Sequence, residues 1–445
     1  MKHYGWLLVL LCIATAPGFA QKKGEKNDDE KESPNIHRVK PGWYVITLNE
    51  TPVIKLQPKG EVQTTEMRNG LIKKVKDYAQ SKELKLKEEN IFVDISVGFR
   101  DSLSKEQYEL ILKDVKEKKI KALKPDFKIK MSDPVKEGQP IQQGQPIQQG
   151  QPIQQNLKNI GTRKFASFAV NEAGGFVDGS TKTTKIWIVD TGISRHPDLN
   201  IDDTLGYNFV DNNQETDDDN GHGTHVAGIA AAKTTTSLID DPGRSITIYL
   251  GVSAGATLVP LKALDDHGEG QWSNLVLALN RIAAHGSPGD VVNLSLGTYA
   301  VTDCDNELPE LKTMIDLLAT IKQIFVVMAA GNDAGEASKN FPGCLNDAPG
   351  TTPQRIFTVA AIRRNGNCTL YSNYGAPPVD LVAVGTNVFS TYLRDPVTQA
   401  WTYTLMSGTS MAAAVISGVI HATNGAIVME DSKCGTPFYK KGKTQ

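Results

Sequence analysis

The sequence has no apolar run long enough to cross a membrane, which needs about 18 consecutive apolar residues. Its first apolar stretch, from Trp6 to Ile13, is much shorter, follows Lys2 and precedes the small-residue stretch Gly18-Phe19-Ala20. These features predict a secretory signal peptide over residues 1–20 and therefore a secreted, extracellular protein. A buried strand is the alternative interpretation of the same run.

The sequence also lacks an excess of charge of either sign. Its 48 Lys and Arg side chains are balanced by 50 Asp and Glu side chains, which gives a net charge of -2. A strongly basic surface is therefore not expected, and this excludes the usual electrostatic signature of nucleic-acid binding. The apolar content of 40% and the charged content of 22% are typical of a soluble globular protein. A length of 445 residues is enough for two or three domains.

Cysteine is scarce, and no two cysteines have the C-x-x-C spacing that is typical of zinc sites. Of five cysteines, Cys12 is removed with the predicted signal peptide. Four cysteines in a secreted chain suggest two disulfides, and three pairings are open to them. We favour the pairs Cys304 with Cys344 and Cys368 with Cys434.

A small domain is predicted over residues 42–131, after a disordered charged segment at 21–41. Extended residues at 43–48 and 91–95 alternate with two helical stretches, and a further extended stretch closes the unit. The helical stretches are 65–81 and the segment after Ser104, which is a good N-cap. This β-α-β-α-β order predicts a compact α+β domain, which we compare with the ferredoxin-like fold.

Residues 132–157 contain three copies of the hexapeptide GQPIQQ, which begin at Gly138, Gly144 and Gly150. Such short polar repeats with Pro and Gly are typical of an exposed linker, where we expect proteolysis. A short β-helix coil is the alternative.

From residue 158 to 445 the pattern changes to buried strands that alternate with helices. The predicted strands are 186–189, 258–264, 291–296, 324–329 and 356–361. The predicted helices are 226–232, 272–284 and 308–322. Near-continuous apolar strands separated by helices indicate a three-layer α/β domain with a parallel sheet that is covered on both faces.

Polar residues with catalytic chemistry follow several of these strands, where ligands bind in parallel sheets. Asp190, Ser295 and Asn332 each follow a strand, and Ser410 begins a helix of small residues. His222 lies between two glycines in "NGHGTHVAG". A serine nucleophile needs a base, the base needs an orienting carboxylate, and the oxyanion needs donors. Taken one at a time, these residues also fit simple turns and helix caps.

The order Asp, His, Ser is that of subtilisin, and the surrounding motifs carry the resemblance further. The segments "VDTGISRHPDL" (189–199), "NGHGTHVAG" (220–228) and "SGTSMA" (407–412) resemble the three catalytic motifs of the subtilisin-like serine proteases, the subtilase family or peptidase S8. "VNLSLG" and "AAGND" are similar to its substrate-wall and oxyanion segments. "YSNYG" and the cysteines resemble the proteinase K-like branch.

The resemblance implies a secreted serine endopeptidase with Asp190 as the orienting acid, His222 as the base and Ser410 as the nucleophile. It implies Asn332 as the oxyanion donor, and a peptide-binding edge at Ser295, Leu296 and Gly297. Residues 42–131 resemble an inhibitory propeptide, so the chain is expected to be a self-processed zymogen and a monomer. Its partners would be protein or peptide substrates and its own propeptide, with no nucleic acid and no membrane.

No cofactor is expected for catalysis, and structural calcium is an open question. Asp198 and Asp380 are similar to calcium ligands of some relatives. The acidic run 215–219 could hold a cation, but we favour a solvated surface.

Two features depart from the family pattern. Ala413-Ala414 replace Ser-Pro or Thr-Pro, a change that the helix is expected to tolerate. The segment after Ser410 is shorter than usual, so a non-catalytic relative that acts as a binding protein is the alternative. A metallohydrolase that uses His222 and His225 is disfavoured, because the H-E-x-x-H motif is absent. We expect His225 to be a packed helix residue.

Overall fold

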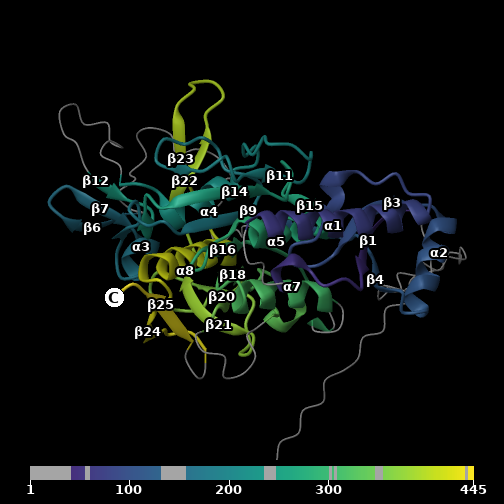
Figure 1. Cartoon of the computed structure of the whole chain (residues 1–445). Helices are drawn as coiled ribbons and strands as arrows, with labels where there is room; N and C mark the ends of the chain where they lie inside the picture. Colours follow the sequence, from purple (N-terminus) through teal and green to yellow (C-terminus); the bar gives the residue numbers. More distant parts are fainter. Residues whose placement is uncertain are drawn as a thin grey trace, which may run out of the picture. The chain divides into compact units, whose positions relative to one another are not determined.

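The computed structural model (Figure 1) describes most of the chain after residue 41. The described residues are 42–55, 61–131, 157–234, 247–299, 303–304, 308–345, 354–435 and 439–445. The predicted signal peptide, the charged segment 21–41 and the repeat segment 132–156 lie outside them. Within the described residues, no helix is both long and apolar enough to span a bilayer.

The N-terminal module, which we define as residues 42–125, contains one four-stranded antiparallel sheet with the order β2-β3-β1-β4. Its elements are β1 (Gly42–Leu48), η1 (Val53–Lys55), α1 (Glu61–Ser81), η2 (Glu88–Asn90), β2 (Ile91–Phe92), β3 (Gly98–Leu103), α2 (Lys105–Lys116) and β4 (Ile120–Pro125). Ser104 caps α2 as predicted, in a reciprocal capping box with Gln107. The chain order is therefore β-α-β-β-α-β rather than the predicted β-α-β-α-β.

The prediction missed β3 because its sequence, GFRDSL, carries three consecutive polar residues. Arg100, Asp101 and Ser102 do not alternate with apolar residues as a half-buried strand should. Phe99 is fully buried in the module's core, whereas Arg100 is buried through contacts outside the module. A tertiary interaction, which a local pattern cannot reveal, accounts for the error.

The large sheet has the order β10-β14-β9-β16-β18-β20-β21-β25-β24, and its pairings are parallel except the last. Its strands are β9 (Lys185–Asp190), β10 (Asn200–Ile201), β14 (Thr257–Lys262), β16 (Val291–Leu294), β18 (Phe325–Ala329), β20 (Ile356–Ile362), β21 (Val379–Val384), β24 (Val428–Asp431) and β25 (Lys440–Lys443), with β11 (Tyr207–Asn208) beside β14. All five predicted strand cores are present. The parallel α/β prediction is therefore confirmed.

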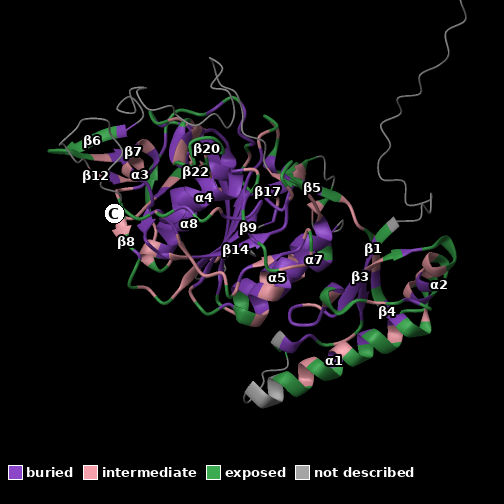
Figure 2. Ribbon diagram, turned by 90° about the horizontal axis from the view of Figure 1, so that it is seen from above, coloured by how far each residue is buried: buried purple, intermediate pink, exposed green. Residues whose placement is uncertain are grey.

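Helices cover both faces of this sheet, which follows from its alternating side chains. Ile186 and Ile188 of β9 pack in one core with α4 (His222–Ala231) and α8 (Thr409–Thr423). Trp187 and Val189 pack in the opposite core with α5 (Trp272–His285) and α7 (Pro309–Thr320). Figure 2 shows β9, α4 and α8 in the purple of buried residues, and α5 and α7 in purple with pink and green on their outer sides. Ala413 and Ala414 lie fully buried inside a continuous α8, as expected.

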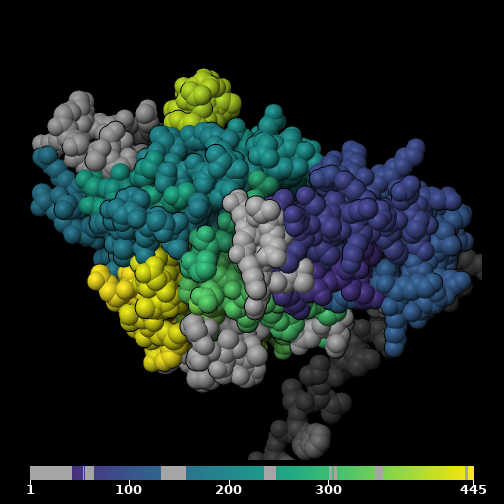
Figure 3. All heavy atoms as spheres, in the orientation of Figure 1, coloured from purple at the N-terminus to yellow at the C-terminus, as the bar shows by residue number. Residues whose placement is uncertain are grey.

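Shorter elements surround this framework. They are β6 (Leu157–Gly161), β7 (Lys164–Ser167), α3 (Phe168–Glu172), β8 (Val177–Asp178), β12 (Thr247–Tyr249), β13 (Ser253–Ala254), η4 (Ala337–Lys339), β19 (Asn340–Phe341), β22 (Val388–Arg394) and β23 (Trp401–Met406). In the space-filling view the yellow-green tip of the β22–β23 hairpin projects at the top of the molecule, and the C-terminal residues form the yellow surface at the lower left (Figure 3).

The C-terminal segment completes one edge of the sheet. Strand β25 adds in parallel to β21, and β24 pairs antiparallel with β25. Disulfides join Cys304 to Cys344 and Cys368 to Cys434, the two pairs that we favoured. The second disulfide ties this C-terminal hairpin to the loop after β20.

His225 is a buried structural residue, as the sequence suggested. Its Nε2 lies 3.0 Å from the Val388 carbonyl and 3.2 Å from that of Thr404, so it fixes α4 to the β22–β23 hairpin. Burial is the main cause that lowers the pKa of His225 to about 3. At neutral pH the ring is therefore neutral and donates Nε2–H to these carbonyls.

We predict that acid destabilises the fold through His225. An unfolded histidine has a pKa of about 6.5, so below this pH the unfolded chain binds more protons than the folded chain. The stabilisation is present above about pH 6.5 and is lost as the pH falls toward about 3, by about 1.4 kcal/mol per pH unit for this group. Urea unfolding of the parent and of His225→Gln at about pH 7 and pH 5 measures this loss.

The variant should show the smaller decrease between the two pH values, because Gln keeps an amide donor but does not titrate. His196, whose pKa burial lowers to about 4, acts equally in both proteins and serves as an internal control. Equal pH dependence in parent and variant would contradict the prediction.

Candidate functional site

The candidate residues gather where three parallel strands end and two buried helices begin. Asp190 is the last residue of β9, Ser295 follows β16, and Asn332 follows β18 by three residues. His222 begins α4, and Ser410 is the second residue of α8. Because β9, β16 and β18 are neighbours, their carboxyl ends lie at one edge of the sheet.

Asp190 and His222 are in direct contact. His222 Nδ1 lies 2.8 Å from Asp190 Oδ1, and both side chains are buried. Asp190 Oδ1 also accepts the Thr191 N–H at 2.8 Å, which fixes the carboxylate at the end of its strand. The contact holds Nδ1 as the donor toward the carboxylate, so Nε2 is the nitrogen that can act as a base.

The start of α4 requires glycine on both sides of His222. Gly221 has a φ of 101°, in the left-handed region that glycine tolerates. A Cβ on Gly221 would lie 2.1 Å from Tyr392 Cε2, and one on Gly223 would lie 2.1 Å from the Gly192 carbonyl oxygen. The two glycines therefore let α4 approach the turn after Asp190 closely.

Ser410 is held by the loop that follows β16. Its Oγ donates to the Ser295 carbonyl at 3.3 Å, and Ser295 Oγ donates to the Ser410 carbonyl at 3.2 Å. Ser295 Oγ also lies 2.7 Å from Asn293 Oδ1, whose amide donates to Ser417 Oγ of α8. The side chain of Ser295 therefore fixes the start of α8, in addition to the backbone position that the sequence suggested for it.

Two hydrogen bonds to Thr409 fix Asn332 and the preceding Gly331 against the start of α8. The Thr409 N–H donates to Asn332 Oδ1 at 2.9 Å, and the Gly331 N–H donates to Thr409 Oγ1 at 3.1 Å. A Cβ on Gly408 would lie 3.2 Å from Asn332 Nδ2. The amide nitrogen of Asn332 therefore lies close to the glycine that precedes Thr409-Ser410.

A strand that follows the N-terminal module lies across this region. Strand β5 (Lys128–Met131) pairs antiparallel with β15 (Glu269–Gln271) on one side and with β17 (Leu296–Tyr299) on the other. Met131 faces Leu296 and Lys130 faces Gly297, two of the predicted peptide-binding residues. Ile129 is 1% exposed and packs in the same core as β9 and α5. The edge predicted to bind a peptide is therefore paired with a segment of this same chain.

Arg100 of the N-terminal module forms a buried polar contact with the second half of the chain. Its guanidinium donates to Ser273 Oγ at 3.1 Å, to Asn212 Oδ1 at 2.9 Å and to Asn274 Oδ1. Burial lowers the pKa of Arg100, and Asp126 is the largest opposing influence. No local pattern reveals this role, because an isolated arginine in a strand is usually solvated.

Asp126 caps helix α5 across the same boundary. Its carboxylate accepts Ser273 Oγ at 2.6 Å and the Ser273 N–H at 3.1 Å. Burial raises the pKa of Asp126, and the bonds from Ser273 oppose this. Phe127 stacks on Trp272 with their ring centroids 5.5 Å apart. The contact between the two parts therefore combines aromatic packing with buried hydrogen bonds.

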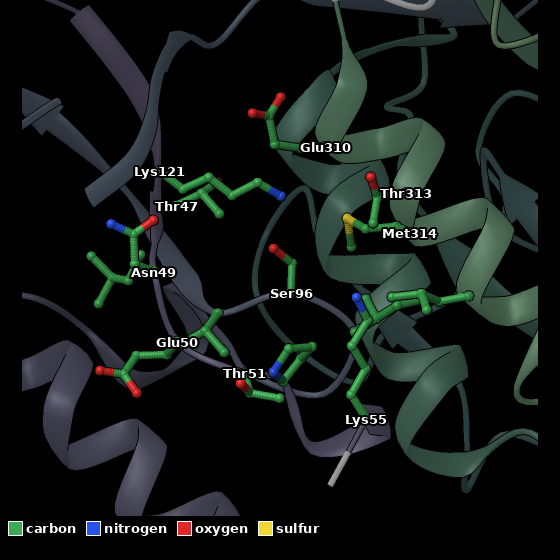
Figure 4. Close-up of a pocket in the computed structure, with 15 residues that line it drawn as sticks. Thr47, Asn49, Glu50, Thr51, Lys55, Ser96, Lys121, Glu310, Thr313 and Met314 are labelled. Atoms are coloured by element: carbon green, nitrogen blue, oxygen red, sulfur yellow. The ribbon is translucent and has the colours of Figure 1, made fainter. Parts of the chain in front are cut away.

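A separate pocket lies between the N-terminal module and α7 (Figure 4). Lys121 of β4 extends toward Glu310 in the first turn of α7, and Lys55 lies on another side of the space. Its lining includes none of the candidate catalytic residues. We regard the pocket as a gap in the boundary between the two parts of the chain.

Both calcium candidates have protein donors. Asp198 Oδ2 accepts Tyr403 Oη at 2.7 Å, and burial raises the pKa of this carboxyl, opposed by Tyr403 and Lys233. Asp380 accepts Gln354 Nε2 at 2.9 Å and the Thr358 N–H at 2.8 Å. The one cluster with metal-like spacing among the described residues, at 265–267, lies largely on the surface. Nothing in these contacts requires a metal.

The acidic run 215–219 differs from our expectation at one of its four carboxylates. Glu215, Asp217 and Asp219 are exposed, as predicted for a solvated run, whereas Asp218 is 5% exposed. Its carboxylate accepts five hydrogen bonds around the start of α4. The prediction was wrong here because composition does not show which carboxylate of an acidic run points inward.

Comparisons with known proteins agree with this arrangement. The model of the Peptidase S8 subtilase family matches residues 181–426, a segment that contains all four candidate catalytic residues. Thermitase of Thermoactinomyces vulgaris is 36% identical over 236 residues, which cover 53% of this chain and 72% of thermitase. Subtilisin BL of Lederbergia lenta is 36% identical over 234 residues, which cover 53% of this chain and 73% of subtilisin BL.

Two further similarities are weaker. The thermophilic serine proteinase of Bacillus sp. strain AK1 is 34% identical over 236 residues, and the match covers 50% of that protein. A cold-adapted subtilisin-like serine proteinase of known structure gives a TM-score of 0.45 at 22% identity, covering 60% of this chain and 90% of that one, which is too weak to support an argument. None of these relatives distinguishes the proteinase K-like branch from the rest of the family, so the resemblance to that branch stays a prediction.

The family match spans more than half of the 445 residues and includes the edge of the sheet where the candidate residues gather. The chain therefore belongs to the subtilase family, the Peptidase S8 family of serine endopeptidases.

Proposed function

We propose that the protein hydrolyses peptide bonds with Ser410 as the nucleophile, His222 as the base and Asp190 as the orienting acid. The observation that carries the proposal is the buried contact of 2.8 Å between His222 Nδ1 and Asp190 Oδ1. A histidine fixed in this way presents Nε2 as a proton acceptor, and the carboxylate stabilises the imidazolium that forms.

The reaction has two halves. Ser410 Oγ attacks the substrate carbonyl carbon while its proton passes to His222 Nε2, which gives a tetrahedral intermediate. The C–N bond then breaks, the amine leaves with the proton from Nε2, and an acyl-enzyme remains. Water repeats the sequence at the ester, which releases a carboxylic acid and restores the Ser410 hydroxyl.

Asn332 is our candidate for the main oxyanion donor. Its Oδ1 is engaged by the Thr409 N–H at 2.9 Å, and this bond orients the side-chain amide beside the start of α8. The N–H of Ser410 lies in the first turn of α8, where backbone donors have no intrahelical acceptor. Together, the Asn332 side-chain amide and the Ser410 N–H would stabilise the negative charge that develops on the carbonyl oxygen.

We also infer that the chain is a secreted zymogen whose N-terminal module, with a ferredoxin-like strand order, acts as an inhibitory propeptide. The support is the antiparallel pairing of β5 with β15 and β17, because an extended substrate adds to a sheet edge in the same way. Ser295, Leu296 and Gly297 would then line the peptide site. Cleavage after Met131, within 132–157, would release the module.

The alternative of a non-catalytic binding scaffold is not favoured. All four candidate residues are present, and His222 and Asp190 are in contact. A monomer that needs no cofactor for catalysis is the simplest form of the proposed enzyme, with structural calcium left as a separate proposal.

We predict that a fluorophosphonate probe labels the full-length protein at Ser410 after self-cleavage between about residues 130 and 160. Ser410→Ala should be neither labelled nor cut, because the only change is loss of the nucleophilic hydroxyl. The measurement is probe fluorescence on a gel together with mass analysis of the fragments. A folded parent that is neither labelled nor cut would contradict the proposed chemistry.

The two histidines of the H-x-x-H motif should respond differently to substitution. His222→Ala should lower kcat by at least about 10⁴-fold with little change in folding, because it removes the base. His225→Ala should lower the free energy of unfolding by about 1–3 kcal/mol, because two buried carbonyls lose their donor. Peptide hydrolysis and urea midpoints are measured on both variants. Equal loss of kcat in two well-folded proteins would show that the division is wrong.

We predict that Arg100→Ala weakens the inhibition by the module. The change removes a buried guanidinium that bonds Ser273, Asn274 and Asn212, and losses of about 2 kcal/mol or more are usual for such groups. The initial rate of probe labelling of the uncut precursor should rise at least about 10-fold. Lys113→Ala is the matched control, because Lys113 is exposed on α2 and pairs only weakly with Glu117. An equal rise in both variants would contradict a specific role for Arg100.

A further inference from the structure

Asp218 accepts more hydrogen bonds than a helix cap needs. Its Oδ1 accepts Thr191 Oγ1 at 2.8 Å, the Asn220 N–H at 3.0 Å and the Gly221 N–H at 2.9 Å. Its Oδ2 accepts the Thr224 N–H at 2.8 Å and Thr224 Oγ1 at 2.6 Å. Three backbone donors at the start of α4 and two hydroxyls therefore meet at one buried carboxylate.

The two hydroxyls extend these bonds across to the segment after β9. Thr191 Oγ1, which donates to Asp218, accepts the Gly223 N–H at 3.0 Å. Thr224 Oγ1, which also donates to Asp218, accepts the Ser194 N–H at 2.9 Å. The residues that follow Asp190 and the residues that flank His222 are therefore joined in both directions through Asp218.

A buried lysine joins the same two segments from the other side. Lys262 Nζ donates to the Thr191 carbonyl at 2.7 Å and to the Asp217 carbonyl at 3.2 Å. In the parallel ladder, Lys262 lies opposite Asp190 itself. Lys262 is 4% exposed and Asp218 is 5% exposed, so solvent screens neither charge strongly. The turn after Asp190 is thus held to the acidic segment by one buried anion and one buried cation.

We propose that Asp218 is a positioning residue for His222. Its carboxylate, acting through Thr191 and Thr224, fixes the first turn of α4 against the end of β9 and so sets the contact between His222 and Asp190. This inference rests on the proposed function, because it assigns Asp218 a part in the same reaction. Asp218 itself touches neither the imidazole nor the substrate edge.

Helix capping alone does not require these contacts. A cap needs an acceptor for the backbone donors of the first turn, and Asp218 already accepts the N–H groups of Gly221 and Thr224. The bond from Thr191 adds nothing to the cap, but it connects the helix to the residue next to Asp190. A displacement of about 1 Å in a catalytic group can cost on the order of 100-fold in rate, so this connection bears on kcat.

Three substitutions in the full-length protein separate positioning from stability. Asp218→Asn replaces Oδ2 with a donor that faces the Thr224 N–H, while the side chain keeps its shape. Thr191→Val removes only the bridging hydroxyl and leaves the bonds from Gly221 and Thr224 to Asp218 in place. Thr358→Val is the matched control, because Thr358 is equally buried and the hydroxyl that the change removes bonds the Leu345 carbonyl, at 3.4 Å, outside the site.

Peptide hydrolysis gives kcat and KM for each self-processed protein, with active sites counted by the fluorophosphonate probe. Urea midpoints are measured on each variant combined with Ser410→Ala. We expect Asp218→Asn and Thr191→Val to lower kcat about 10- to 100-fold with KM within twofold, because β15 and β17 are untouched. Thr358→Val should keep the parent's kcat even if its urea midpoint is lower. If a variant processes itself too slowly to yield mature protein for kcat, the first-order rate of self-cleavage of its precursor is compared with that of the parent instead.

A parent that neither labels nor hydrolyses peptides would refute the proposed function. An active parent whose Thr191→Val and Asp218→Asn variants keep kcat within twofold would refute the positioning role alone. A loss of kcat that follows the urea midpoint across all three variants, the control included, would also refute it, because Asp218 would then act only through stability.

Discussion

The rest of the site depends on the buried hydrogen bond between His222 and Asp190. An imidazole and a carboxylate that meet without solvent contact stabilise each other only if other groups hold their geometry, because neither can form a hydrogen bond to water instead. Asp190 is held because β9 lies between β14 and β16 in the large sheet. His222 is held because α4 packs on α8 and on the β22–β23 hairpin. The sheet and its covering helices thus fix two side chains that are far apart in sequence.

The boundary with the N-terminal module combines buried polar groups with aromatic packing, a combination that suits the proposed release of the module. Across it, Arg100 donates to Ser273 and the Asp94 N–H donates to Asn280 Oδ1 of α5. Asp126, which directly follows the module, accepts the Ser273 hydroxyl. Each of these groups can be solvated again after separation, whereas a purely apolar face would be left exposed to water. Strand β5 adds backbone pairing to both β15 and β17, and β17 directly follows Ser295, whose Oγ bonds the Ser410 carbonyl.

The sequence predicted the framework well and its long-range polar contacts poorly. Strands such as 324–329 and helices such as 272–284 follow from apolar runs and periodicity, which depend on local residues only. Strand β3 was missed because Arg100 interrupts its alternation, and Arg100 is buried by partners from residues 209–274. Asp218 was placed in a solvated run because it stands among other acidic residues. Both errors concern buried polar side chains: the partners of Arg100 lie far along the chain, and Asp218 bonds Thr191 as well as the nearby start of α4.

The two histidines of α4 show how position decides chemistry within one helix. Residues three apart on a helix lie on nearly the same side but one turn along its axis. His222 is in the first turn, where the flanking glycines bring it against the end of β9. His225 lies one turn further along, under two strand carbonyls, where burial keeps its pKa at about 3. A neutral ring with its nitrogen committed to carbonyls holds the hairpin in place. A ring paired with a carboxylate, by contrast, can gain and return a proton. The spacing that resembles a metal site therefore joins one residue that we propose for proton transfer to one that packs under the hairpin.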